Sequence, residues 1–295
     1  MTSAKPPQGP EKAAPNASNA PDVEEEEGGP PMTFWEHLDE LRKRLTVCMV
    51  VLVVGAFGAY AYAPKLLQLL TRPFHSSWKA NNLPGDGTMH FSSPGGAVIA
   101  YVKLSMVAGL VAAAPVIFYQ IWSFIAPGLY AKEKRFVIPF VLFSTLLFVG
   151  GGLFAFTAAF PMTFNFFLSM AGQLGDGGVT IVPTIMMSEY IDFALQMILA
   201  FGVIFELPLL ILFLSLAGIV NYLQLIRFGR WFVLLAFVIA AVFTPPDMTS
   251  QIVMAVPMIV LYVISIGIAF IFGKPPTEAQ REAYRKAREK TKEPA

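Results

Sequence analysis

The chain has 295 residues, of which 55% are hydrophobic and only 14% are charged. This balance excludes an ordinary soluble domain, which would expose far too much apolar surface to water. The formal net charge of +1 gives no indication of nucleic-acid binding. The single cysteine, Cys48, excludes an internal disulfide or a cysteine-rich metal site. We therefore expect a membrane protein with several spans.

The chain opens with a segment that cannot bury enough apolar surface to fold. Residues 1–32 are rich in Pro and Ala and carry four consecutive Glu residues, so we expect a disordered acidic tail. The apolar run 45–63 follows three basic residues and contains an Ala-Tyr-Ala sequence, a combination that mimics a secretory signal peptide. We favour an uncleaved span, because about 19 apolar residues exceed the usual signal core and a long polar tail precedes them.

Six apolar segments follow one another, and each can satisfy its backbone hydrogen bonds as a membrane helix. They are residues 45–63, 97–124, 136–160, 190–217, 229–243 and 251–272. The fifth segment has about 15 residues, fewer than the roughly 20 that a bilayer core requires, and the sixth has little length to spare. We expect a short final hairpin, joined by Pro245 and Pro246, that stops short of one membrane face or thins the bilayer there. The membrane domain thus covers residues 33–273, and a charged cytoplasmic tail covers 274–295.

The orientation is predicted from basic residues near the span ends, which accumulate on the cytoplasmic side. One set of ends carries Arg42, Lys43, Arg44, Lys132, Lys134, Arg135, Arg227, Arg230, and Lys274 with six further basic residues after it. The loops on the other side contribute only Lys65, Arg72 and Lys79. Both termini, including the 1–32 tail, are therefore expected in the cytoplasm.

Four motifs resemble the TatC family. They are FWEHLDELRKR (34–44), YQIWSFIAPGLYAKEKR (119–135), FGVIFELP (201–208) and FTPPDMTSQ (243–251). With the six-span layout, the resemblance covers essentially residues 34–272. It implies an all-α, polytopic fold with a curved helical wall in the bacterial inner membrane, and a role as core receptor subunit of the twin-arginine translocase. One departure is Val263, since family members typically carry a Glu soon after the position matching Leu261-Tyr262.

A ligand with two arginines calls for carboxylate partners, because guanidinium groups stay protonated and pair well with planar carboxylates. Glu40 and Glu133 lie at the predicted cytoplasmic interface, where partial desolvation strengthens such pairs. The resemblance implies that both bind the signal peptide, that Phe124 and Pro127 belong to the same surface, and that Arg42 orients Glu40. The alternatives are that Glu133 balances its basic neighbours, that Glu40 is solvated, that Arg42 only sets the topology, that Phe124 is an interfacial anchor, and that Pro127 ends a helix.

Glu206 lies near the middle of the fourth apolar segment, where an ionised side chain costs at least a few kcal/mol. It should therefore not face lipid tails. Pro208 removes a backbone donor two residues later and can kink the helix. The resemblance implies that Glu206 forms a polar spot on the concave wall, where a partner helix docks; the alternative is a structural hydrogen bond to a neighbouring span. Lys103 is expected to snorkel toward the membrane surface.

A second polar group surrounds the turn at Pro245-Pro246. It comprises Thr244, Asp247 and Gln251, and Asp247 or Thr249 can cap the sixth helix. The resemblance implies that Thr244 and Gln251 help to form a docking site for the single-span subunits TatA and TatB. Capping alone is the alternative.

No cofactor, metal or catalytic site is predicted. The three His residues lack ligand spacing, and the sequence has no phosphate-binding loop and no nucleophile elbow, so we expect neither a metal site nor an enzyme. The resemblance implies the proton-motive force as the energy source. The expected partners are twin-arginine signal peptides, TatA, TatB, membrane lipid and further copies of the chain, but not nucleic acid. A proton-coupled secondary transporter, with Glu206 as proton site and Lys103 as countercharge, is the alternative function.

Overall fold

The computed structural model describes residues 34–85, 87–91, 93–125, 137–173, 180–181, 183–244, 247–278, 280–282 and 285. Six helical segments within these residues are long and apolar enough to cross a membrane: Trp35–Tyr60, Gly96–Ile125, Val137–Ser169, Met187–Leu216, Tyr222–Phe243 and Met248–Phe272. The predicted all-α fold with six spans is therefore confirmed. The predicted tail 1–32 lies outside the described residues, as does most of the predicted tail 274–295.

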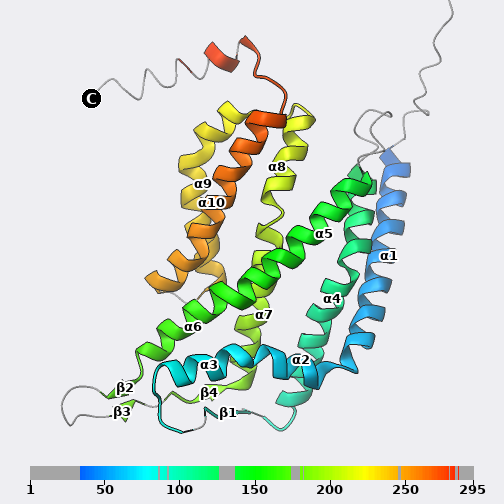
Figure 1. Ribbon diagram of the computed structural model, residues 1–295. Helices are drawn as coiled ribbons and strands as arrows, with labels where there is room; N and C mark the ends of the chain where they lie inside the picture. Colours follow the sequence, from blue (N-terminus) through cyan, green and yellow to red (C-terminus); the bar gives the residue numbers. More distant parts are fainter. Residues whose placement is uncertain are drawn as a thin grey trace, which may run out of the picture.

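The spans consist of both continuous and interrupted helices (Figure 1). The continuous ones are α1 (Phe34–Tyr60), α4 (Gly96–Ile125), α9 (Tyr222–Phe243) and α10 (Met248–Phe272). The third span joins α5 (Val137–Phe154) to α6 (Phe160–Ser169) through a π-helical turn, Ala155–Ala159, and the fourth joins α7 (Met187–Ile204) to α8 (Leu207–Leu216). Two short helices, α2 (Ala63–Leu70) and α3 (Arg72–Ala80), connect the first span to the second.

All six spans are longer than predicted; the first begins at Trp35 instead of residue 45, and the extensions of the third and the fifth have a local cause. The third continues to Ser169 instead of ending at residue 160, because the π-helical turn just before Pro161 accommodates the proline without ending the helix. The fifth begins at Tyr222 instead of residue 229. Asn221 caps it with a reciprocal pair of hydrogen bonds to Gln224, a capping box.

The helices form a wall with α1 at one end and the α9–α10 hairpin at the other (Figure 1). The first residue of α1 and the last of α10 lie at the same end of the bundle, called the terminal face below. The last two spans are the shortest of the six, with 22 and 25 residues, as predicted. Their connecting turn also ends well before the face at which α2 and α3 lie, called the opposite face below (Figure 1). The last two spans are thus the shortest, as predicted, but the expected length of about 15 residues for the fifth is wrong, because its 22 residues exceed the roughly 20 that a bilayer core requires.

The opposite face is closed by α2 and α3, which run across the ends of the spans (Figure 1). Phe74 of α3 is fully buried among Trp78, Phe164 and Tyr190, with ring centroids 5.6 to 5.8 Å away. The Tyr190 hydroxyl donates a 2.7 Å hydrogen bond to the carbonyl of Leu70. This aromatic cluster fastens α3 to the third and fourth spans. Nearby, β1 (Met89–His90) pairs in parallel with β4 (Ile185–Met186), and β2 (Gly172–Gln173) pairs antiparallel with β3 (Thr180–Ile181).

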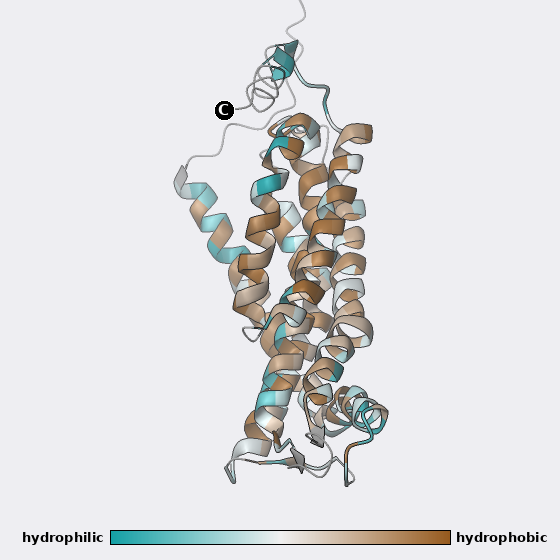
Figure 2. Cartoon of the chain, turned by 90° about the vertical axis from the view of Figure 1, so that its left-hand side faces the viewer, coloured by the Kyte–Doolittle hydropathy of each residue, from teal (hydrophilic) through white to brown (hydrophobic). Residues whose placement is uncertain are grey.

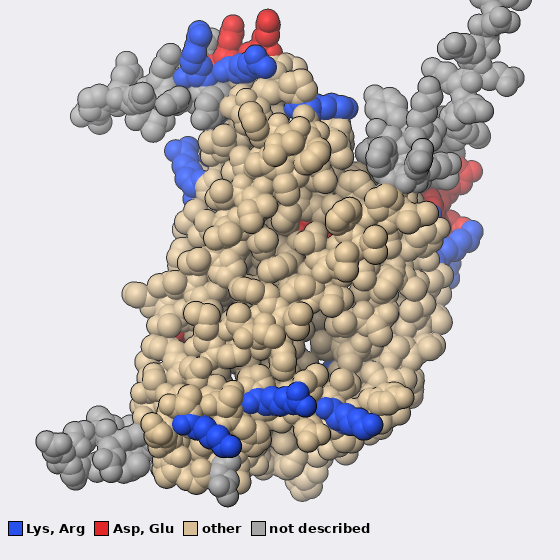
Figure 3. Space-filling view, viewed as in Figure 1, with Lys and Arg blue, Asp and Glu red and all other residues tan. Residues whose placement is uncertain are grey.

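Charge and hydropathy divide the described part of the molecule into three zones. The middle of the spans is predominantly apolar, and polar residues concentrate toward the two ends (Figure 2). Figure 3 shows basic groups along the opposite face and mixed charges at the terminal face. The described basic residues of the terminal face are those of α1, the first turns of α9 and the segment after α10. This distribution is typical of a protein whose apolar middle lies in lipid.

Candidate functional site

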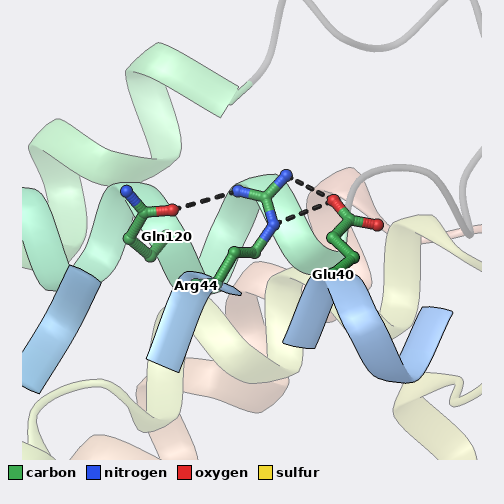
Figure 4. A network of polar contacts seen from close by, with 3 residues as sticks. All are labelled: Glu40, Arg44 and Gln120. Carbon is green, nitrogen blue, oxygen red and sulfur yellow. Dashed lines mark hydrogen bonds and ion pairs between the residues drawn. The ribbon is translucent and has the colours of Figure 1, made fainter. Parts of the chain in front are cut away.

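A polar network lies near the start of α1, on the terminal face (Figure 4). Glu40 and Arg44 are four residues apart, so they lie on one face of the helix. The Arg44 Nε and Nη2 atoms donate to Glu40 Oε1 at 2.9 and 2.5 Å. Arg44 Nη1 donates to Gln120 Oε1 on α4 at 3.2 Å. The guanidinium therefore links a carboxylate on the first span to an amide on the second.

The second oxygen of Glu40 has no partner among the residues that the structure describes. Its Oε2 atom is buried, and none of these residues donates a hydrogen bond to it. The side chains of Arg44 and Glu40 are only 23% and 21% exposed, so water only partly screens this pair. A buried acceptor without a donor is unfavourable, and an acceptor next to a protonated guanidinium is best satisfied by a second cationic donor. The network thus contains one buried, unsatisfied acceptor on a half-buried carboxylate.

Arg42 does not orient Glu40, contrary to the expectation from the resemblance. Residues two apart on an α-helix point about 200° away from each other, so Arg42 lies on the exposed side of α1. Arg44 takes the orienting role instead. The sequence does indicate this pair, because Glu40 and Arg44 are four residues apart, the spacing at which opposite charges pair on a helix.

Phe124 lies beside the same network. Its ring stacks on that of His37 with centroids 4.4 Å apart and an angle of 15° between the planes. Because His37 is three residues before Glu40, this stack joins the last turn of α4 to the face of α1 that carries the carboxylate. Pro127 and Glu133 lie outside the described residues. Their segment leaves α4 at Ile125, at the same end of the bundle as Glu40 (Figure 1).

Glu206 lies at an interruption of the fourth span. The α-helix stops at Ile204 and resumes at Leu207. Between them, the backbone amide of Glu206 donates a 3.1 Å hydrogen bond to the carbonyl of Val203, three residues before it, which makes a tighter turn than that of an α-helix. Pro208 explains the break, because it has no amide hydrogen to continue the helical ladder. The interruption lies where Pro208 was expected to disturb the helix. The break turns Glu206 to a half-buried position in which its Oε1 atom is buried without a partner.

Polar side chains from two neighbouring spans lie near Glu206. Ser144 of α5 interacts with the Glu206 carboxyl. Its hydroxyl also accepts a 2.8 Å hydrogen bond from the Trp122 indole of α4. Three spans thus contribute polar atoms here, nearer the terminal face than the opposite face, since Trp122 lies close to the end of α4 and Ser144 close to the start of α5. Sequence reasoning missed Ser144 and Trp122, since neither is charged and both fit an apolar helix.

The turn between the last two spans has the predicted cap. Asp247 caps α10, because its carboxylate accepts a 2.7 Å hydrogen bond from the Ser250 amide. Its Oδ1 atom is buried and unpaired. The Thr244 hydroxyl is buried and donates to the Ala240 carbonyl at 2.9 Å. The backbone amide of Gln251 donates to the backbone carbonyl of Asp247 at 3.3 Å. Pro245 and Pro246 lie outside the described residues.

The site residues form three groups rather than one. Glu40 and Phe124 lie together at the terminal face, Glu206 lies at the break of the fourth span, and Thr244, Asp247 and Gln251 surround the final turn. No hydrogen bond or ion pair joins these groups within the described residues. That part of the chain also contains no group of three or more His, Cys, Asp or Glu residues able to hold a metal ion.

Lys103 has a partner that the sequence did not reveal. Its ammonium donates to both carboxylate oxygens of Asp192 on α7, at 2.7 and 2.8 Å. The pair borders a cavity of about 210 Å³ lined by Ser93, Gly96, Lys103, Ser188 and Asp192, among others. Lys103 therefore forms its ion pair with Asp192 and not with Glu206, and the countercharge proposed for a transporter is engaged elsewhere.

The chain is similar to known proteins of one family. The family model described as "Sec-independent protein translocase protein (TatC)" matches residues 36–257. A Koribacter versatilis protein, "Sec-independent protein translocase protein TatC", is 38% identical over 253 residues, covering 85% of this chain and 90% of its own length. A protein of the same name from Aquifex aeolicus is 36% identical over 251 residues, covering 85% and 98%.

A solved structure is similar as well. The crystal structure described as "Twin Arginine Translocase Receptor- TatC" superposes with a TM-score of 0.69 at 36% identity. The match covers 79% of this chain and 98% of that one. Sequence and fold therefore agree over most of the chain.

Proposed function

We propose that this chain, which belongs to the TatC family and is a core subunit of the twin-arginine translocase, binds twin-arginine signal peptides at its terminal face. It is a multi-pass protein of the bacterial inner membrane. The terminal face is the cytoplasmic one in this proposal, because the basic residues of the span ends collect there. The 1–32 and 274–295 tails are then cytoplasmic as well, and the second of them contacts lipid headgroups through its basic residues.

The observation that carries this proposal is the state of the Glu40 carboxylate. One oxygen is held by the guanidinium of Arg44, and the other is buried without a donor. A peptide arginine that donates to Oε2 removes the cost of this unpaired acceptor and gains a charge-assisted hydrogen bond. Phe124, stacked on His37 beside the carboxylate, offers an apolar surface for the rest of the peptide.

Glu133 supplies the second carboxylate in this proposal. Two arginines require two acceptors for full pairing, and α4 ends at Ile125 and α5 begins at Val137 at the end of the bundle where Glu40 lies (Figure 1). Pro127 and Phe124 complete the surface between the two carboxylates. The role is one of binding and translocation, without a catalytic step.

Binding of two synthetic peptides tests the site. Purified protein in detergent should bind a signal peptide with Arg-Arg much more tightly than the same peptide with Lys-Lys, because the planar fork of guanidinium donors matches the two oxygens of a carboxylate, whereas an ammonium is a strongly hydrated point charge. Glu40→Gln and Glu133→Gln should each remove most of this preference. Asp39→Asn is the matched control, since Asp39 is an exposed carboxylate one residue from Glu40 that pairs with Lys43. Unchanged affinity in both Gln variants, with normal membrane insertion, contradicts the proposal.

A second surface serves partner subunits in this proposal. Glu206 has a buried oxygen at the break of the fourth span, and Asp247 has one at the final turn, and neither has a hydrogen-bond partner among the described residues. A single-span helix with a polar side chain at the right depth can satisfy either oxygen. We assign these positions, with Thr244 and Gln251, to the docking of TatA and TatB and to contacts between copies of the chain. Transport is then driven by the proton-motive force.

The transporter alternative is not supported. The comparisons match translocase subunits, and Lys103 pairs with Asp192 instead of with Glu206.

A further inference from the structure

The Glu40 carboxylate is already bound by the chemical group that it is proposed to recognise. Arg44 presents a guanidinium with two donors on one oxygen, at 2.9 and 2.5 Å. A helical ion pair at this spacing is common and by itself contributes little to function. Two further features are not explained by helix stability alone: the buried, unpaired Oε2 of Glu40, and the contact of Arg44 with Gln120 across the helix interface.

We propose that Arg44 is an internal competitor, which occupies Glu40 in the unliganded protein and gives way to a peptide arginine, while Gln120 retains the displaced guanidinium (Figure 4). This inference rests on the proposed function, because it concerns the regulation of the same carboxylate. It makes Arg44 and Gln120 affinity-setting residues that need no contact with the peptide.

The geometry provides a stepwise exchange. Both donors of Arg44 bind Oε1, so an incoming arginine can first engage Oε2 without displacing Arg44, once the atoms that bury Oε2 have moved aside. As the peptide arginine moves to bind both oxygens, Arg44 must release Oε1. Its Nη1 atom is already 3.2 Å from the Gln120 carbonyl oxygen, so the guanidinium keeps one hydrogen bond on a neutral acceptor throughout the exchange.

An internal occupant lowers the apparent affinity for every ligand of the site. When only a fraction of the protein has its binding group free, the apparent dissociation constant rises by the inverse of that fraction. A weaker bond between Arg44 and Glu40 should therefore give tighter peptide binding. A lysine at position 44 weakens this bond without removing the positive charge, because an ammonium is a point charge without the planar fork of arginine.

Opposite effects of two variants test the exchange. In peptide titrations with the purified full-length protein, Arg44→Lys should lower the dissociation constant of the Arg-Arg peptide by on the order of threefold to tenfold, by the occupancy relation. Gln120→Leu should raise it, because the displaced guanidinium then loses its acceptor. A purely structural role for the network predicts weaker binding in both variants. Lys43→Arg is the matched control, since Lys43 is exposed and pairs with the exposed Asp39, and the affinity of this variant should equal that of the wild type.

Failure of this inference and failure of the proposed site give different results. If Glu40→Gln abolishes binding while Arg44→Lys leaves it unchanged or weaker, Arg44 is not a competitor and the site itself stands. If Glu40→Gln and the wild type bind the Arg-Arg peptide equally, the site is wrong and the inference is overturned with it. Size-exclusion profiles of all variants identify any loss of folding, and the opposite directions expected for Arg44→Lys and Gln120→Leu cannot both come from such a loss.

Discussion

Lys103 of α4 and Asp192 of α7 form a two-point ion pair, with the ammonium 2.7 and 2.8 Å from the two carboxylate oxygens. The side chains are 44% and 49% exposed, so solvent or headgroups screen the pair. It joins the second and fourth spans near the opposite face. The pair therefore fastens two parts of the wall at a level where charge is tolerated.

We expect this pair to contribute modestly to stability. Exposed ion pairs contribute about 0–1 kcal/mol, so Lys103→Met and Asp192→Asn should each lower the midpoint of thermal unfolding by only a few degrees. Exchange of the two residues, Lys103→Asp with Asp192→Lys, should restore much of the loss. Circular dichroism in detergent measures the midpoints. A drop in the double exchange equal to the sum of the single losses would show that the two charges do not interact.

Gly109 sets the distance between the first two spans. A Cβ atom at Gly109 would lie 2.4 Å from the Ala56 backbone nitrogen on α1, and one at Gly55 would lie 2.9 Å from the Gly109 carbonyl oxygen. Real side chains do not approach backbone this closely, so Gly109→Ala must push α1 away from α4. Gly58→Ala is the control on α1, because its Cβ would meet nothing within 4 Å.

The expected loss is of the size of other overpacked sites, about 1–3 kcal/mol. Gly109→Ala should also weaken signal-peptide binding, because Arg44 on α1 and Gln120 on α4 would move apart. Thermal unfolding and peptide titration of the two alanine variants measure both effects. Equal behaviour of Gly109→Ala and Gly58→Ala would contradict the close approach of the helices.

The six spans could be predicted from the sequence because apolar length alone distinguishes a membrane helix from other elements. Their ends were less certain where a local contact decided them. The fifth span extends back to Tyr222 because of the capping box at Asn221, in a stretch where Arg227 and Arg230 had suggested a loop. The third passes through Pro161 because a π-helical turn accommodates the proline.

The site could be predicted only in part. Glu40, Phe124 and Glu206 were identified from charge, position and resemblance, and the structure stacks Phe124 of α4 on His37, three residues before Glu40 on α1. The polar contacts of Arg44, Glu206 and Lys103 were not identified from the sequence. Gln120, Ser144 and Asp192 each come from a different span from the residue that they contact, and the sequence alone does not determine which faces of two apolar helices meet.

Glu206 should be more important for transport than for folding. Its Oε1 atom is buried without a donor, and an unpaired buried polar atom costs about 1–3 kcal/mol. Glu206→Leu removes this cost, so it should raise the unfolding midpoint while it abolishes export of a twin-arginine cargo in cells. Binding of the Arg-Arg peptide should be unchanged, because Glu40 lies elsewhere. A variant with a lower midpoint and normal export would show that Glu206 serves the fold alone.

Asp247 distinguishes helix capping from partner docking. Asn is as good an N-cap residue as Asp, so Asp247→Asn should keep the hydrogen bond from Ser250 and the stability, whereas Asp247→Ala should lose about 1 kcal/mol. If the unpaired, buried Oδ1 of Asp247 accepts from a partner helix, the Asn variant should still reduce export, because an amide nitrogen cannot accept. Unfolding midpoints and export assays on both variants separate the two roles. Export that falls only in the Ala variant, in step with its stability, would assign Asp247 to capping alone.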